Sequence, residues 1–393
     1  MAVRSREVAP TGVDDQRRRA VVAAIEGSEI NIYSFSLDGA DQRLLATHDI
    51  GYLNLGPNHH PWPVSLVSAT ISKSGNLIVY KVPGPAAQVS PIGPGSIFVM
   101  DPNGENKRKI LDQISFYYPS PDGSKVLYAE VPPPAVSVPG GGRPARSPSR
   151  NWRILDIVTG EDRPVITDEA LGHGFTVFQS WIDEEKAVFA SFFYDDAELF
   201  FVGLNNRSAK EIHVPTATRY FGATDETSVS ASGVGSVLLA SHDRSRLGGW
   251  PGSCDIFELN SDGTLGELYV TDQLFTCQNV HWNNDDELFY TKETRPVPMS
   301  LTSEENYLPV PIRDSVFSFD LETKTTHRVL LSNGTSDYTM VSLLPNHALY
   351  VVNGDIHRSP RIIHEIRDLD GGNPITLLSG DWFERPVFVG WSI

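Results

Sequence analysis

Histidine and carboxylate side chains are the residues of this sequence best suited to proton transfer. His242 and Asp243 are adjacent, and His281 lies in a later apolar segment. Histidine exchanges protons near neutral pH, and a neighbouring carboxylate can orient its ring. If the protein is an enzyme, we therefore predict that His281, His242 and Asp243 are its catalytic residues. For any single histidine, the alternative is a polar side chain with no chemical role.

A second group of residues combines aromatic rings with polar side chains, as ligand-binding surfaces do. Most of them lie in the segments between short apolar runs. The predicted ligand-binding residues are His59, His60, Trp62, Tyr118, His173, Trp250, Gln278 and Tyr338. The rings of this group suit an apolar ligand or a sugar.

The elements that would position these residues form a repeat of roughly 50 residues. Each copy has an apolar strand, a turn rich in Gly, Asp or Asn, a second apolar strand and then two more strands. Clear copies begin near residues 68, 117 and 280. Short apolar runs bounded by turn residues indicate an all-β protein. A repeated four-stranded antiparallel meander is typical of the blades of a β-propeller.

The two ends of the chain determine the predicted number of blades. Residues 20–46 supply three strands of a repeat without its first, and residues 385–393 supply a lone first strand. Together with six complete repeats, they predict a seven-bladed β-propeller closed by a composite blade from both termini. We expect residues 1–19 to be a disordered lead-in and residues 20–393 to form a single propeller domain.

Nearly all the long insertions fall on one predicted face of this propeller. They are residues 47–63, 82–95, 131–150, 243–253 and 294–313. Long loops gathered on one side of a rigid scaffold indicate a binding or catalytic face. The alternative is disordered decoration without a function.

The turn Ser120-Pro121-Asp122-Gly123 and the other Asp-Gly turns resemble the WD40-like repeats of TolB and of prolyl-oligopeptidase propellers. The resemblance covers most of the chain from about residue 20, and it implies a fold rather than a chemistry. The chain contains no Gly-x-Ser-x-Gly sequence, so we do not expect a serine peptidase.

The string from Gln278 to Asn283 is similar to the Gln-x-x-His-x-His manganese ligands of oligogalacturonate lyases, which are propellers of this repeat type. Gln278 and His281 match that motif, whereas Asn283 replaces its last histidine. The resemblance implies that Gln278 and His281 bind a divalent cation, for which we consider Mn, Ca or Zn. The position on a first strand predicts that alternate side chains point into the channel. The alternative is that both residues satisfy backbone groups.

The charge and the cysteines bear on partners and compartment. The net charge of −17 argues against a nucleic acid or an anionic membrane as the partner. The N-terminus lacks the apolar core of a signal peptide, which predicts a cytoplasmic protein unless a leader was removed. Cys254 and Cys277 should lie close together on adjacent blades, either as a disulfide or as two buried thiols.

Two functions fit these observations. The first is a monomeric binding propeller whose small-molecule, glycan or protein partner docks on the long-loop face. The second is a propeller enzyme, namely a lyase, isomerase or cyclase, with a histidine-rich site at the channel mouth. The sequence leaves both open.

Overall fold

The computed structural model describes sixteen segments of the 393-residue chain. They are residues 18–26, 29–49, 68–72, 74–83, 94–130, 150–171, 175–193, 196–212, 237–241, 254–272, 276–284, 286–294, 313–331, 338–354, 361–381 and 386–392. All but one of the elements in these segments are β-strands, as predicted. The exception is the single 3-10 turn η2 (Asp168–Leu171). None of the described helices is long and apolar enough to cross a bilayer.

The first two sheets take up the amino-terminal half of the described chain and the last strand. One sheet has the order β26 (Val387–Ser392), β1 (Arg19–Glu26), β2 (Glu29–Ser36) and β3 (Gln42–Asp49). The other has seven strands: β4 (Ser68–Ile71), β5 (Ile78–Pro83), β6 (Gly95–Met100), β7 (Arg108–Pro119), β8 (Lys125–Glu130), β9 (Asn151–Asp156) and β10 (Asp162–Thr167).

The remaining four sheets follow in chain order. They comprise β11 (Phe175–Asp183), β12 (Lys186–Phe193), β13 (Asp196–Gly203) and β14 (Ser208–Ile212); β15 (Val237–Ser241), β16 (Cys254–Leu259) and β17 (Leu265–Asp272); β18 (Thr276–Asn284), β19 (Glu287–Thr294), β20 (Arg313–Asp320) and β21 (Thr325–Leu330); and β22 (Tyr338–Leu344), β23 (Ala348–Asn353), β24 (Arg361–Arg367) and β25 (Ile375–Asp381). Every ladder among them is antiparallel.

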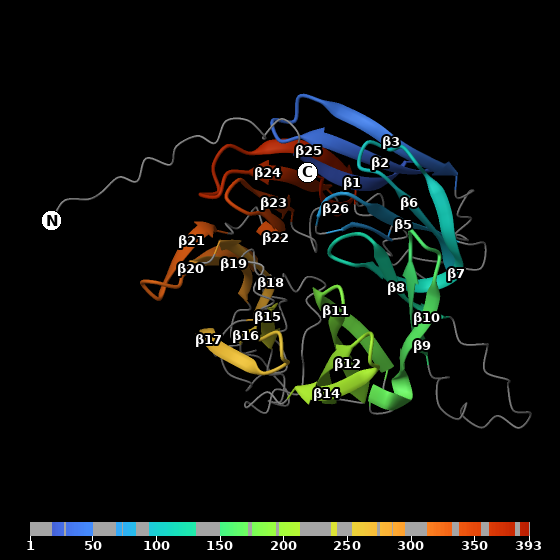
Figure 1. The fold of residues 1–393 in the computed structure, drawn as a ribbon. Coiled ribbons are helices and arrows are strands. Elements are labelled where there is room, and N and C mark those ends of the chain that lie inside the picture. The colour runs from blue at the N-terminus through green and yellow to red at the C-terminus, as the bar shows by residue number, and fades with distance from the viewer. Residues whose placement is uncertain are drawn as a thin grey trace, which may run out of the picture.

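The sheets stand around a common centre in a propeller-like arrangement, with β11, β18, β22 and β26 nearest the centre (Figure 1). Burial follows from this arrangement. The second strand of a repeat is packed between neighbouring sheets on both faces, so Ile78 to Lys81 of β5 are all buried. The outermost strands β14 and β21 are exposed along most of their length. Burial therefore decreases from the inner to the outer strands of a sheet. A sheet with one solvent-exposed face would instead show buried and exposed residues in alternation along each strand.

One sheet differs from the predicted repeat. The sequence predicts a break between the repeat that ends near residue 112 and the one that starts near residue 117. In the structure both belong to the long strand β7, whose first half pairs with β6 and whose second half pairs with β8. Gln113 has a φ of +59° at the junction, so the chain turns there without an intervening loop. A direct junction of this kind fuses two repeats into one seven-stranded sheet.

The core is divided among seven clusters of buried hydrophobic side chains in the described residues. Each cluster draws on two groups of strands that are consecutive in the repeat. Trp152 of β9, for example, meets Phe189 of β12 edge-on at 5.1 Å between ring centroids. Tyr350 of β23 lies 4.0 Å from the ring of Phe388 of β26. The stability of each sheet therefore depends on its neighbours.

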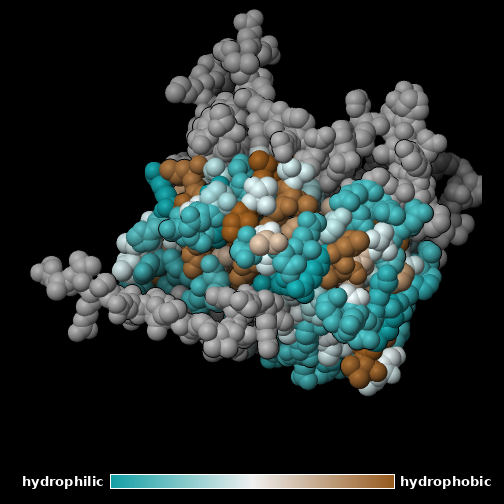
Figure 2. All heavy atoms as spheres, turned by 90° about the horizontal axis from the view of Figure 1, so that it is seen from above, coloured by the Kyte–Doolittle hydropathy of each residue, from teal (hydrophilic) through white to brown (hydrophobic). Residues whose placement is uncertain are grey.

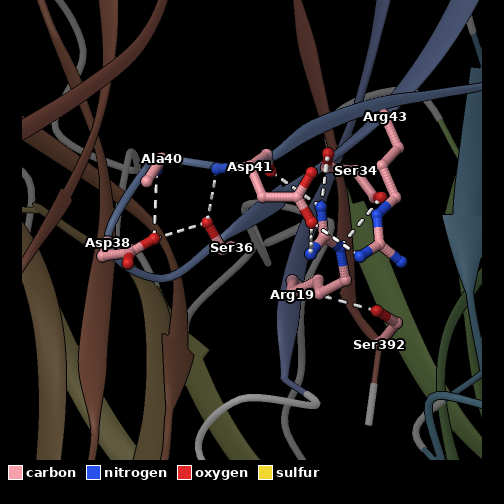
Figure 3. Close-up of polar contacts among 8 residues, drawn as sticks. All are labelled: Arg19, Ser34, Ser36, Asp38, Ala40, Asp41, Arg43 and Ser392. Carbon is pink, nitrogen blue, oxygen red and sulfur yellow. Dashed lines mark hydrogen bonds and ion pairs between the residues drawn. The ribbon is translucent and has the colours of Figure 1, made fainter.

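The predicted pairing between the two ends of the chain is present. β26 pairs with β1 from Val387↔Ala23 to Ser392↔Arg19. Arg19 is buried and donates to Ser34 Oγ at 3.0 Å and to Asp41 Oδ2 at 2.9 Å. Figure 3 shows this guanidinium enclosed by the β2–β3 turn, with Ser392 reaching the Arg19 carbonyl from the other strand. The bonded carboxylate and backbone carbonyls compensate for the burial of the charge.

Some turn glycines allow the backbones of adjacent sheets to approach each other closely. A Cβ on Gly104 (φ +87°) would lie 2.8 Å from the Leu45 carbonyl oxygen, whereas one on Gly160 (φ +74°) would meet nothing within 4 Å. Both alanine variants bear the strain of a positive φ, about 1 kcal/mol. Gly104→Ala also forces two sheets apart, so it should lose roughly 1–3 kcal/mol more than Gly160→Ala. Urea unfolding at equal m-value measures the difference, and equal midpoints would contradict this packing.

Candidate functional site

Three of the predicted site residues have described side chains, namely Tyr118, His281 and Tyr338. For Gln278 the structure describes the backbone alone. The others lie outside the described residues: His59, His60, Trp62, His173, His242, Asp243 and Trp250. Most of the predicted long-loop face also lies there, so the assignment of these residues to a common site stays a prediction.

His281 lies on the inner strand β18 with 8% of its surface exposed. A bulge between Gln278 and His281, with Asn279 at φ +53°, shifts the register of this strand. Val280, Trp282 and Asn283 are buried as well. Whether alternate side chains of this strand point into the channel stays a prediction. The strand contacts β15 and β16 of the preceding sheet and β22 of the following one.

Asn283 connects two sheets instead of completing a row of ligands. Its Oδ1 accepts the N–H of Asn346 at 2.7 Å, in the turn between β22 and β23. Its Nδ2 donates to Glu287 Oε2 at 2.9 Å. Across the described segments no group of three or more His, Cys, Asp or Glu side chains could hold a metal ion. The role of Gln278 and His281 in metal binding remains a prediction.

The cysteines lie beside this strand. Cys277 is fully buried in the cluster between β16–β17 and β18–β20, and it is disulfide-bonded. Cys254 is the only other cysteine of the chain. Of the two alternatives that the sequence leaves open, the structure has the disulfide. It ties β18, and with it His281, to the preceding sheet.

Tyr118 belongs to an aromatic cluster between the seven-stranded sheet and the β11–β14 sheet. Its ring stacks on Phe178 of β11, with centroids 4.3 Å apart and planes 29° from parallel. Phe116, two residues earlier on β7, carries the Arg150 guanidinium over its ring at 4.5 Å. Tyr118, Phe116 and Arg150 are each partly exposed. The cluster thus combines aromatic rings and a positive charge where β7, the start of β9 and β11 meet.

Arg150 is held in place by a network of buried polar groups. Its Nη1 donates to the Thr176 carbonyl at 3.2 Å, and its backbone N–H donates to Asp168 Oδ2 at 3.1 Å. Asp168 also accepts from Thr176 Oγ1 and from Trp152 Nε1. Burial lowers the pKa of the Arg150 guanidinium, and the charges of Asp168 and Tyr118 oppose this effect. Arginine nevertheless keeps its charge at neutral pH.

A similar contact occurs one sheet segment earlier. Lys81 of β5 is 3% exposed, and its Nζ donates to the Ser115 carbonyl at 3.1 Å, next to the bulge of β7. Burial lowers the pKa of this ammonium group. Lys81 and Arg150 therefore both bind a backbone carbonyl of the inner strand that follows. At Ser115 the bulge of β7 leaves the carbonyl outside the ladder with β8, and Lys81 satisfies it.

The sequence reasoning found Tyr118 but missed Arg150, Phe116 and Phe178. One signal was available for Arg150, since it ends the long segment 131–150 and directly precedes an apolar strand. The phenylalanines gave no signal that separates them from core residues. Tyr338, also predicted, lies on the β22–β25 sheet, far in sequence from Tyr118. The Arg367 guanidinium of the same sheet is 5.2 Å from the centre of its ring. Tyr118, His281 and Tyr338 lie on three different sheets.

His48, at the end of β3, supplies a prediction on pH. Its Nε2 lies 2.7 Å from Tyr80 Oη, and its ring lies 4.7 Å from that of Phe98. Burial, and secondarily Lys107, hold the pKa of His48 below its ordinary value. As the pH falls through about 6.5, the unfolded chain takes up a proton that the folded protein resists. The melting temperature should therefore fall between pH 7.5 and 5.5, and less so in His48→Gln. An equal fall in both proteins would contradict this role.

Comparison with protein families and with curated proteins finds no match. Among solved structures, acylaminoacyl peptidase from Pyrococcus horikoshii aligns with a TM-score of 0.55 at 10% identity, over 92% of this chain and 50% of that one. A prolyl endopeptidase aligns with a TM-score of 0.51 at 12% identity, over 83% and 46%. TolB from Acinetobacter baumannii gives a TM-score of 0.43 at 14% identity, over 98% and 89%.

The likeness is one of fold. At these identities it shows an all-β, propeller-like architecture of antiparallel sheets and nothing of the chemistry. The chain spans about half the length of the two peptidases that it matches. The sequence-based prediction of an all-β, propeller-like fold is confirmed at this level.

Proposed function

We propose that this protein is a seven-bladed β-propeller, closed by the β26–β1–β2–β3 sheet, that binds a ligand or partner on its long-loop side over the centre. The seven hydrophobic clusters support the number of blades, because each joins two consecutive repeats and the last joins β22–β25 to β26 and β1. The long strand β7 counts in two blades, since it pairs with β6 and then with β8.

The observation that carries the binding function is the partly exposed cluster of Phe116, Tyr118 and Arg150. Phe116 and Tyr118 pack against the hydrophobic cluster between β8–β10 and β11–β13, and their rings remain partly exposed beside the Arg150 guanidinium. Arg150 directly follows the long segment 131–149, so the cluster lies on the side of the long insertions. The large hydrophobic residues that are most exposed in the described segments are Leu44, Val158, Leu268 and Leu331, which are dispersed over four sheets. Figure 2 accordingly shows hydrophobic spheres in separate small groups on a mainly hydrophilic surface.

Shortened loops test this function. Residues 132–148 and residues 296–311 are each replaced by a short Gly-Ser linker, and the proteins are screened by thermal shift against sugars, sugar acids, aromatic acids and short peptides. A ligand that stabilises the parent chain should not stabilise at least one shortened chain, although the melting temperatures without ligand stay similar. Val158→Ser, in a short turn on the opposite side, is the control and should bind normally. Ligands that bind both shortened chains as tightly as the parent would exclude the long-loop side.

The alternative function is an enzyme that uses His281. The same ligand screen distinguishes it from a protein that only binds its ligand. A propeller enzyme should convert a ligand that stabilises it, and His281→Asn should abolish that conversion while the fold is retained. A binding propeller should leave every stabilising ligand chemically unchanged, which mass spectrometry of the recovered ligand detects.

A further inference from the structure

The turn between β13 and β14 contains the tripeptide Asn206-Arg207-Ser208. Asn-x-Ser/Thr is the acceptor sequence for N-linked glycosylation, which requires a position at the surface of the folded protein. Residues 205–210 are all exposed, and β14 is the outermost strand of its sheet (Figure 1). A glycan attached at this turn would therefore extend into solvent without disturbing the packing of the sheets.

The hydrogen bonds of the turn orient the Asn206 side chain. Its Oδ1 accepts from the Ser208 backbone N–H at 3.1 Å and from Ser208 Oγ at 2.7 Å. A backbone N–H can only donate, so Oδ1, and not Nδ2, faces Ser208. Asn206 makes no further hydrogen bond within the described part of the chain. Its Nδ2, the atom to which a sugar would be joined, is therefore unbonded at an exposed position.

The rest of the turn is held from the neighbouring sheet. Arg163 of β10 donates through Nη1 to the Leu204 carbonyl at 2.8 Å and through Nη2 to Asn205 Oδ1. These bonds and the two from Ser208 shape the turn, and none of them uses Asn206 Nδ2. Attachment of a glycan to that nitrogen consequently breaks no hydrogen bond of the folded turn.

The disulfide of Cys277 bears on the compartment in which this modification takes place. Disulfides form and persist in oxidising, secretory compartments and are rare in the cytoplasm. Acceptor tripeptides are glycosylated in the secretory route as well. The sequence leaves open a cytoplasmic protein and a secreted one, and the secreted protein agrees with both the disulfide and the exposed acceptor.

We propose that Asn206 is an N-glycosylation site and that the protein folds in a secretory compartment. The donor is an oligosaccharide joined to a lipid diphosphate. The anomeric carbon of its first sugar forms a bond to Asn206 Nδ2, and the bond from that carbon to the diphosphate oxygen breaks. The lipid diphosphate leaves with the electron pair of the broken bond, and the amide nitrogen releases one proton. This inference does not depend on the proposed binding function.

Protein isolated from its natural source provides the test. An amidase that releases N-linked glycans, used in heavy-oxygen water, converts each glycosylated asparagine to an aspartate that carries the heavy isotope. Tandem mass spectrometry should find this label at Asn206 and unlabelled asparagine at Asn205, and a digestion without the amidase should give no label at either position. An unmodified Asn206 in the isolated protein would overturn the proposal.

Variants make the test specific for the residue. They are expressed from the full gene in a eukaryotic cell, without an added leader. Asn206→Gln and Ser208→Ala should each lose one amidase-sensitive step in gel mobility, whereas Ser208→Thr should keep it because threonine also completes the acceptor. Asn205→Gln, one residue away, is the matched control and should keep the step. Asn333 begins a second acceptor tripeptide outside the described residues, and Asn333→Gln separates its contribution. A parent chain and an Asn206→Gln chain of equal mobility before treatment would contradict the assignment.

Discussion

A chain that ends at residue 385 should lose its cooperative unfolding transition. It would lack β26, so β1 would lose its ladder from Ala23 to Arg19 and present an unpaired edge at the centre. Phe388 and Trp391 would also leave the cluster around Tyr350. The loss of one strand, the buried Trp391 ring and the partly buried Phe388 ring exceeds about 5 kcal/mol, which is comparable with the whole stability of many domains. Circular dichroism and calorimetry measure the transition.

A peptide and a point variant make this prediction sharper. A synthetic peptide of residues 385–393 added to the truncated chain should restore the transition, because it supplies the missing strand in trans. Trp391→Phe keeps the strand and most of the ring but loses the Nε1 bond to Ser342 Oγ at 3.1 Å. It should cost only about 1–2 kcal/mol. An unchanged melting curve of the truncated chain would show that β26 does not hold the ends of the chain together.

Removal of the disulfide should produce the second large effect. The variant Cys254→Ala/Cys277→Ala releases a loop of about two dozen residues in the unfolded chain, which costs about 3 kcal/mol of stability in the chain-entropy account. Alanine is the appropriate replacement because Cys277 is fully buried among apolar side chains and a hydroxyl would lack a partner there. Guanidinium-induced unfolding under oxidising conditions measures the loss.

Reducing conditions provide the control for this experiment. With a strong reductant present during unfolding, the parent chain should lose most of its advantage over the alanine variant, because neither unfolded chain is then cross-linked. A parent chain that is equally stable with and without reductant would show that the disulfide does not contribute. The control also tests whether the tie between β16–β17 and β18 matters for the strand that carries His281.

The repeat made the fold predictable from the sequence alone. Apolar runs such as residues 126–129 and 348–352, each followed by turn residues, specify antiparallel meanders by local rules of propensity and turn chemistry. The pairing of the last strand with the first was predictable for the same reason, since residues 20–46 lack a first strand and residues 385–393 supply one. Burial of a repeated apolar face requires a neighbouring copy of the repeat, so the repeated pattern also indicated how the sheets would pack.

The tertiary structure alone decided where individual side chains lie. His281 and Asn283 occupy the last two positions of the metal-ligand motif that the sequence resembles. Both side chains are nevertheless buried, because the inner strand packs between the neighbouring sheets. Asn283 bonds to Asn346, a partner 63 residues away in the chain. Arg150, directly before β9, contacts Phe116 of β7 and Thr176 of β11. No local sequence pattern encodes a contact among three such distant segments. Strand patterns are set by nearest neighbours in the sequence, whereas the site depends on which strands the packing of the sheets against one another brings together.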